Sequence, residues 1–214
     1  QAIINYVALL GWCPSDNQEM FTLDELTRAF SIDGISKSPS IFDYDKLEWF
    51  NGEYIRKMSP EEFTSYAMPY YKEAVTSREL PWDKLCGILQ QRVTRFTQIP
   101  EMIDFFDKLP EYDAEMFVNK KSKTNLENAP VMLKAVTDRL TALESWDKDS
   151  IHDCLINLAQ ELEVKNGTVM WPARIAAAGK KVTPGGAVEI LEILGRDESL
   201  ARLNFCLLYT SDAA

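Results

Sequence analysis

The stretch Ser59-Pro-Glu-Glu-Phe-Thr-Ser-Tyr-Ala-Met-Pro-Tyr-Tyr71 shows most directly how this chain folds. Ser59 can cap a helix, Pro60 suits the first helical position because its missing N–H costs nothing there, and a glutamate stands three residues after the cap. Apolar side chains then recur at helical spacing, at positions 63, 66, 67, 70 and 71. The stretch therefore predicts an amphipathic helix that begins at Ser59-Pro60.

Two other stretches favour helices in the same way. Thr22-Leu-Asp-Glu25 has the sequence of a capping box, and a second apolar stripe at helical spacing consists of Ile151, Leu155, Leu158 and Leu162. Runs of alternating β-branched and polar residues are short, and glycine and proline separate helical segments instead. We therefore predict an all-α fold, with a turn at Asn51-Gly52 and a break at the polar segment 119–125.

Composition excludes several classes of protein. The chain has 214 residues, 46% of them hydrophobic, which is enough for one sizeable core or two small ones and excludes a disordered tail or a disulfide-stapled miniprotein. The longest apolar runs, such as Ala2 to Trp12, fall short of the roughly 20 residues that a membrane span needs. We therefore expect no contact with a membrane.

The cysteines and the histidine offer no catalytic or metal-binding pattern. Cys13, Cys86, Cys154 and Cys206 form neither a CxxC motif nor a zinc-ribbon spacing, which favours reduced thiols and a cytoplasmic location. The single histidine, His152, lies in a helix-like run, where a solvated or capping position is the simplest interpretation. We therefore predict no catalytic residue and no metal ligand.

Positive charge is concentrated although the net charge is −10. Three windows contain no Asp or Glu but hold ten of the 23 basic residues: 84–100, 116–126 and 164–188. If the fold brings these windows to one face, they form an electrostatic footprint for a nucleic-acid backbone, and the turn Thr183-Pro-Gly-Gly186 could meet unstacked bases. The alternative is that the windows arise by chance and their lysines are merely solvated.

Three segments together resemble one family. Tyr6-Val-Ala-Leu-Leu-Gly-Trp12, the segment from Ser36-Lys-Ser-Pro to Glu53-Tyr-Ile-Arg56, and Trp171-Pro-Ala-Arg-Ile-Ala-Ala-Ala-Gly179 are similar to the C-terminal half of bacterial-type glutamyl-tRNA synthetases, in the order of that family. The resemblance extends from residue 1 to about residue 203. Ile35-Ser-Lys-Ser38 also echoes the KMSKS signature of class I synthetases, but the family resemblance assigns that stretch a non-catalytic place, so we expect no catalytic role for Lys37.

The resemblance implies a tRNA-binding fragment of an enzyme. It implies elongated helical bundles that form an anticodon-binding cage, with the end of the stem-contact domain at 1–58, a first anticodon-binding subdomain at 59–118 and a second at 119–203. Residues 204–214 lack helical periodicity of their own and are expected to be a non-native tail. The parent enzyme would attach glutamate to tRNA(Glu) with ATP and Mg²⁺. This fragment would lack the N-terminal catalytic domain, need no cofactor and be inactive alone, and we expect a monomer.

The resemblance also assigns candidate contacts to the anticodon. Arg92 matches the arginine that reads the third anticodon base, a cytosine, and a guanidinium offers paired donors to the acceptor edge of that base. Arg174, Thr183 and Pro184 match the residues that meet the other two bases. Gly185-Gly186-Ala187 departs from part of the family, where a single glycine precedes a bulky apolar residue.

The other candidates have less specific roles. Trp171 could stack on a base or belong to the core, and the core is favoured. Trp49 and Tyr54 are interpreted as packing residues, in a region that the resemblance places between the catalytic half and the anticodon cage. The candidate phosphate contacts are Lys46, Arg56, Lys84, Arg95, Lys120, Lys121, Lys123, Lys180 and Lys181. The competing hypothesis is an acidic helical module that binds a basic protein and no RNA.

Overall fold

The computed structural model describes residues 1–14 and 17–211, and its described residues form helices joined by turns. The α-helices are α1 (Ala2–Gly11), α2 (Leu23–Ala29), α3 (Tyr44–Arg56), α4 (Pro60–Ala74), α5 (Trp82–Leu89), α6 (Ile99–Ile103), α7 (Asn128–Thr141), α8 (Lys148–Glu161), α9 (Asn166–Ala178), α10 (Ala187–Leu194) and α11 (Arg196–Ser211). Short 3₁₀ turns are η1 (Ile32–Gly34), η2 (Phe96–Gln98), η3 (Asp104–Phe106) and η4 (Ala114–Phe117). The only β-pairings in this part of the chain are isolated bridges, which confirms the all-α prediction.

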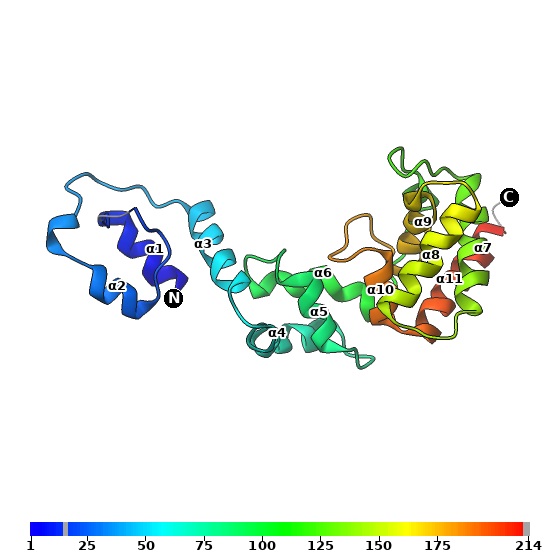
Figure 1. The fold of residues 1–214 in the computed structure, drawn as a ribbon, viewed down its shortest axis with the longest axis horizontal. Helices are drawn as coiled ribbons and strands as arrows, with labels where there is room; N and C mark the ends of the chain where they lie inside the picture. Colours follow the sequence, from blue (N-terminus) through cyan, green and yellow to red (C-terminus); the bar gives the residue numbers. More distant parts are fainter. Residues whose placement is uncertain (15–16, 212–214) are drawn as a thin grey trace.

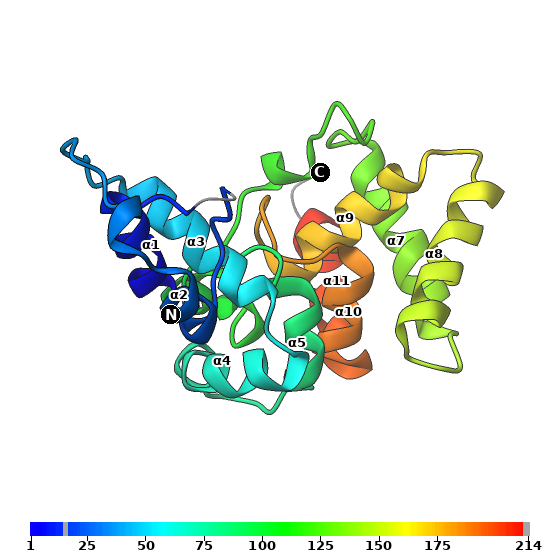
Figure 2. The ribbon, with the colours of Figure 1, turned by 60° about the vertical axis from the view of Figure 1, so that its left-hand side comes forward.

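The molecule is elongated, with its helices in three successive groups. Figure 1 places α1–α3 at one end, α4–α6 in the middle and α7–α11 at the other end, and Figure 2 shows α7 and α8 on the side away from α1–α3. The first group has small cores of its own, around Tyr6 with Phe50 and around Trp12 with Phe21. One continuous core begins at Ile55 and includes both remaining groups, so the two anticodon-binding subdomains expected from the sequence share their apolar interior.

Both helix starts indicated by the sequence are confirmed. The Thr22 hydroxyl accepts from the N–H of Glu25 at 3.2 Å, and the Glu25 carboxylate accepts from the N–H of Thr22 at 2.7 Å, which completes the capping box of α2. The Ser59 hydroxyl accepts from the N–H of Glu62 at 3.1 Å and begins α4. These contacts satisfy amide groups that the first turn of a helix would otherwise leave unpaired.

The predicted turn at Asn51-Gly52 is wrong, because α3 runs without interruption from Tyr44 to Arg56. The side-chain amide of Asn51 donates to the carbonyl of Thr94. A Cβ built on Gly52 would lie 3.2 Å from the Thr94 methyl carbon, so the absent side chain lets that loop approach the helix. Long-range packing therefore overrides the local turn propensity of the Asn-Gly pair.

The apolar stripes lie largely where the sequence places them. Phe63 and Tyr71 are fully buried, whereas Tyr66 is 56% exposed and packs against Phe96 at the surface. In α8, Leu155 is buried and Leu162, just after the helix, is 39% exposed. The stripes thus predict the buried faces correctly and fail only at their margins.

The mid-chain break at 119–125 is confirmed as a tight turn. Asn119 and Thr124 exchange two backbone hydrogen bonds, of 3.0 and 3.1 Å, and Lys123 adopts a positive φ of 54°. We call the segment 119–125 the lysine loop, because it carries Lys120, Lys121 and Lys123. It joins the middle group to α7.

Residues 204–211 are helical although their sequence shows no helical periodicity of its own. Helix α11 continues to Ser211, and Cys206 is buried in the main core. The non-native origin of 204–214 stays a prediction, and residues 212–214 lie outside the described residues.

Arg202 of α11 joins the last two groups of helices. Its guanidinium donates to the carbonyls of Phe105 at 2.7 Å and Ala177 at 2.8 Å, and its Nε donates to Glu198 at 2.6 Å. The Arg202 side chain is 4% exposed, and this burial lowers the pKa of its guanidinium. Arg78, in the turn after α4, forms an ion pair with the same Glu198 at 2.9 Å. The junction is therefore held by buried, charge-assisted contacts.

Asp107 anchors the turn after α4. Its carboxylate accepts from the N–H groups of Ser77 and Thr76, each at 2.7 Å. These two backbone hydrogen bonds, with a smaller contribution from the Ser77 hydroxyl, hold the pKa of Asp107 below its ordinary 3.8. The turn thus depends on an ionised carboxylate.

None of the described helices is long and apolar enough to cross a bilayer.

Candidate nucleic-acid interface

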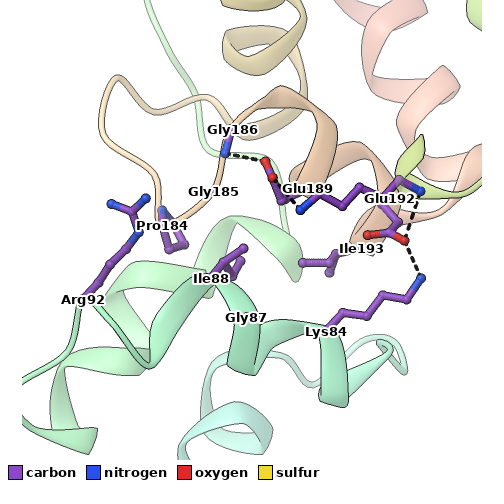
Figure 3. A pocket seen from close by; sticks show the side chains of 11 residues that line it. Lys84, Gly87, Ile88, Arg92, Pro184, Gly185, Gly186, Glu189, Glu192 and Ile193 are labelled. Atoms are coloured by element: carbon purple, nitrogen blue, oxygen red, sulfur yellow. Dashed lines mark hydrogen bonds and ion pairs between the residues drawn. The ribbon is translucent and has the colours of Figure 1, made fainter. Parts of the chain in front are cut away.

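A pocket of about 360 Å³ lies where the middle group of helices meets the last group. Its walls come from α5 and the turn after it on one side, and from the 183–186 turn and α10 on the other (Figure 3). The volume falls within the range of about 300 to 1,000 Å³ that is typical of small-ligand pockets. Arg92 and Pro184, assigned to one site from sequence although they are 92 residues apart, both line it.

Arg92 reaches this pocket from a firmly held turn. Gln90, at the end of α5, donates from its side-chain amide to the carbonyls of Ile55 at 3.0 Å and Met58 at 2.8 Å. The N–H of Arg92 donates to the carbonyl of Leu89 at 2.8 Å. The exposed Arg92 guanidinium has no hydrogen bond or ion pair with any residue that the structure describes. The backbone is therefore fixed while the paired donors of the side chain remain available.

The 183–186 turn packs closely onto α5. The Thr183 hydroxyl donates to the carbonyl of Gly185 at 2.8 Å, and Pro184 is buried. A Cβ built on Gly185 would lie 3.3 Å from the Cγ2 of Ile88, and the N–H of Gly186 donates to Glu189 at 3.0 Å. The Gly185-Gly186 pair, which departs from part of the family, therefore lets this backbone approach the helix that leads to Arg92.

Arg174 supports the same loop from α9. Its guanidinium donates to the carbonyl of Lys181 at 3.1 Å and lies 4.6 Å from the ring centroid of Trp171. Burial lowers the pKa of Arg174. Trp171 is half-buried, packs against the main core and donates from Nε1 to the carbonyl of Met116 at 3.1 Å. This arrangement agrees with the core interpretation of Trp171, whose ring also faces the Arg174 guanidinium.

The acid-free window 116–126 meets the window 164–188 along one face of α9, and the window 84–100 meets it at the 183–186 turn. Gly167, Trp171 and Arg174 share a helix face by their spacing. Gly167 approaches Ser122 of the lysine loop, Trp171 bonds to Met116, and Arg174 bonds to the loop that continues to Pro184. The 13 residues of α9 separate the lysine loop from the 183–186 turn by about 20 Å, and Figure 1 shows the two loops at opposite ends of the helix. The windows therefore form an extended track and do not gather in a single groove.

Carboxylates from elsewhere in the chain neutralise part of this track. Five of the nine candidate phosphate contacts form ion pairs: Lys46 with Glu19, Arg56 with Glu53, Lys84 with Glu192, Arg95 with Glu48, and Lys180 with Asp104. The other four are exposed and have no ion-pair partner among the described residues: Lys120, Lys121, Lys123 and Lys181. Basic residues in windows without Asp or Glu can therefore still pair with carboxylates that the fold brings from other parts of the chain.

Comparison with known proteins matches this chain to two protein families. Residues 50–207 match the family described as anticodon binding domain. The chain belongs to the anticodon binding domain family. Residues 1–49 match a second family, described as the catalytic domain of class I tRNA synthetases (E and Q). The anticodon binding domain match includes the whole track, that is, the windows 84–100, 116–126 and 164–188.

The relatives of this anticodon binding domain are glutamate–tRNA ligases. The ligase of Clostridium kluyveri is 48% identical over 205 residues, which are 96% of this chain and 42% of that protein. The ligase of Clostridium novyi is 50% identical over 206 residues, 95% of this chain and 42% of that protein. The chain therefore spans about 42% of the length of these relatives.

Solved structures of ligases from Elizabethkingia share the fold. The glutamate–tRNA ligase of E. meningosepticum, solved with its amino acid, superposes with a TM-score of 0.84 at 27% identity, over 97% of this chain and 40% of that one. The enzyme of E. anophelis superposes with a TM-score of 0.80 at 26% identity over the same shares. The helical anticodon binding architecture is thus common to this chain and to full ligases.

The N-terminal candidates have mixed outcomes. Tyr54 packs as predicted, because its hydroxyl lies 2.8 Å from the Asn5 side chain and donates to the carbonyl of Phe21 at 2.5 Å. Trp49 packs only in part, since its ring meets Phe50 edge-on with the centroids 5.0 Å apart but the side chain is 44% exposed. Trp49 therefore presents a large apolar surface to solvent.

Six residues that line the pocket were missed by sequence reasoning: Gly87, Ile88, Lys148, Glu189, Glu192 and Ile193. Six of the eight residues of α10 are buried, and the two that are not are Glu189 and Glu192. Their spacing of three puts both on one face of the helix. Glu189 and Glu192, the two acids of an otherwise apolar helix, were the sequence signal that could have indicated these pocket residues. They follow directly after the acid-free window that ends at residue 188.

The described residues offer no catalytic constellation. Lys37 lies exposed in a bend, and His152 lies exposed beside Asp153. Across residues 1–14 and 17–211, no group of three or more His, Cys, Asp or Glu side chains is arranged to hold a metal ion.

Proposed function

We propose that this chain is the tRNA-binding, C-terminal part of a glutamate–tRNA ligase and that it recognises the anticodon of tRNA(Glu). The observation that carries the proposal is that Arg92 and Pro184, which come from different groups of helices, line one pocket while the Arg92 guanidinium is unpaired among the described residues. Membership of the anticodon binding domain family and the ligase relatives support it.

In this proposal the pocket receives the third anticodon base, a cytosine. The Arg92 guanidinium donates to the acceptor edge of the base, and buried Pro184 supplies an apolar wall. Thr183, Pro184 and the backbone of their turn meet the other two bases. Arg174 positions that turn, because its guanidinium donates a hydrogen bond to the carbonyl of Lys181.

Four unpaired candidate lysines of the track meet the phosphate backbone: Lys120, Lys121, Lys123 and Lys181. Lys181 lies next to the base pocket, and the lysine loop lies at the far end of α9, so both can follow one strand of an RNA loop. The five candidates with carboxylate partners contribute less, because a phosphate would have to displace a bound carboxylate. In this proposal the four lysines without partners bind RNA, and the five paired candidates stabilise the protein.

The whole enzyme would attach glutamate to tRNA(Glu) with ATP and Mg²⁺ in the cytoplasm, acting as a monomer. Its catalytic domain would supply the ATP site, and the residues described here assign no ligand to Mg²⁺. We expect this chain alone to bind tRNA without charging it. No observation on the described residues favours the alternative, a helical module that binds a basic protein.

The test is a binding measurement with two tRNA(Glu) transcripts that differ only in the third anticodon base, cytosine or guanine. Wild type should prefer cytosine by roughly 5- to 150-fold, since one good base contact is worth about 1 to 3 kcal/mol. Arg92→Gln should lose most of that preference. Arg139→Gln, which removes an exposed arginine paired with Glu161 on the far side of the last group, should keep it. Equal preference in wild type and Arg92→Gln would remove Arg92 from the role.

A further inference from the structure

We infer that Lys84 and Glu192 form a positioning pair that sets the separation between Arg92 and Pro184, an inference that rests on the proposed function. The Nζ of Lys84 lies 2.7 Å from the Oε1 of Glu192. Lys84 belongs to α5 and Glu192 to α10, so the ion pair bridges the two groups of helices (Figure 3). All four residues line the same pocket.

Contacts that do not involve Lys84 hold Glu192 in place. Helix α10 is buried on its other faces, and the carbonyl of Leu191 accepts from Trp146 at 2.9 Å and from Ser199 at 3.1 Å. The Oε1 of Glu192 also accepts from the N–H of Lys148, the first residue of α8, at 3.2 Å. With its side chain only 12% exposed, Glu192 is a rigid acceptor.

The pair acts on the two helix ends that carry the base contacts. Arg92 follows the end of α5 by three residues, and Pro184 precedes the start of α10 by three residues. At the Pro184 end the two elements touch through Gly185 and Ile88. At the other end the bridge between them is Lys84 with Glu192. Without that bridge the Gly185 contact is left to hold the 183–186 turn against the fixed α5, and Pro184 can move relative to the Arg92 donors.

A direct phosphate contact by Lys84 is the competing role, and exchange of the two charges separates the alternatives. With the charges reversed, a positioning pair keeps the attraction between the two helices and loses only the hydrogen bond that Glu192 accepts from the N–H of Lys148. A phosphate contact is lost when a glutamate replaces Lys84, whatever stands at position 192. The double exchange is therefore the decisive variant.

The experiment compares wild type, Lys84→Glu, Glu192→Lys and the double exchange. Each protein is titrated with the cytosine and guanine transcripts at several salt concentrations, and deuterium uptake by the 183–187 segment is measured without RNA. Each single reversal should reduce the cytosine preference about tenfold and raise deuterium uptake, and the double exchange should restore both within about threefold. Lys134→Glu, which reverses a charge paired with Asp138 on α7, controls for added negative charge and should keep the preference.

Three results would overturn the inference. The first is a double exchange that stays as poor as Lys84→Glu while the slope of log affinity on log salt falls by about 0.7 to 0.9, because Lys84 then contacts a phosphate. The second is an unchanged cytosine preference in both single reversals. The third is equal deuterium uptake in all four proteins. Wild type that lacks any base preference would refute the proposed function, and deuterium uptake would still decide whether the pair holds the loop.

Discussion

Removal of Arg202 should cost more stability than removal of any exposed arginine. The Arg202 guanidinium satisfies the carbonyls of Phe105 and Ala177, and its Nε satisfies Glu198, all in a site where the side chain is 4% exposed. Methionine fills the volume of the aliphatic stem but offers no donor. Arg202→Met therefore leaves two buried carbonyls unpaired and leaves Glu198 with only one arginine.

The magnitude follows from those orphaned groups. An unsatisfied buried acceptor costs about 1 to 3 kcal/mol, so two of them cost about 4 kcal/mol. The same figure falls within the roughly 3 to 5 kcal/mol measured when one partner of a buried ion pair is removed. For a chain of this length about 1 kcal/mol lowers Tm by roughly 2 to 4 °C, so Arg202→Met should lower Tm by roughly 8 to 16 °C.

Thermal unfolding followed by circular dichroism measures this shift, with Arg139→Met as the matched control. Arg139 also pairs with a glutamate, Glu161, but the two side chains are 41% and 54% exposed. Removal of an exposed pair costs about 0 to 1 kcal/mol. A Tm for Arg202→Met within about 3 °C of that control would refute the claim that the junction is held by buried charge-assisted contacts.

Three further predictions concern separate features of the chain. Gly179→Ala should cost about 2 kcal/mol, because φ is +62° there and a Cβ would lie 2.8 Å from a proline ring, whereas Gly11→Ala, with nothing within 4 Å, should be close to neutral; equal Tm values would contradict this. The pKa of Asp107 is lowered on folding, so its contribution to stability is complete above about pH 5 and is lost as the pH falls below 3.8. Asp107→Asn should therefore flatten the fall of the urea midpoint between about pH 5 and pH 3, and an unchanged pH dependence would disprove the link. Replacing the three lysines of the lysine loop by glutamine should lower the slope of log tRNA affinity on log salt by about 2, and an unchanged slope would place the loop off the RNA.

Local contacts explain which parts of the fold could be predicted from the sequence. The caps at Thr22 and Ser59 are formed by groups three residues apart, so the necessary chemistry lies within one short stretch. The apolar stripes of α4 and α8 are similarly local. The Asn51-Gly52 turn was predicted from the same kind of signal and is wrong, because a loop more than 40 residues later packs against that helix.

Charge pairing over long distances in sequence explains which parts of the site could not be predicted. Lys84, Arg95 and Lys180 lie in windows without acid, yet each meets a carboxylate 108, 47 or 76 residues away. Only the folded chain reveals which lysines remain uncompensated. The proximity of Arg92 and Pro184 was expected from the family resemblance and not from their spacing, and it holds in the structure.

The most direct test of the account is a structure of this chain bound to the anticodon stem-loop of tRNA(Glu). We predict that the third anticodon base enters the pocket between Arg92 and Pro184, with the Arg92 guanidinium about 3 Å from the acceptor atoms of the cytosine. A complex in which that base lies outside the pocket, with Arg92 facing solvent or only phosphate, would contradict it.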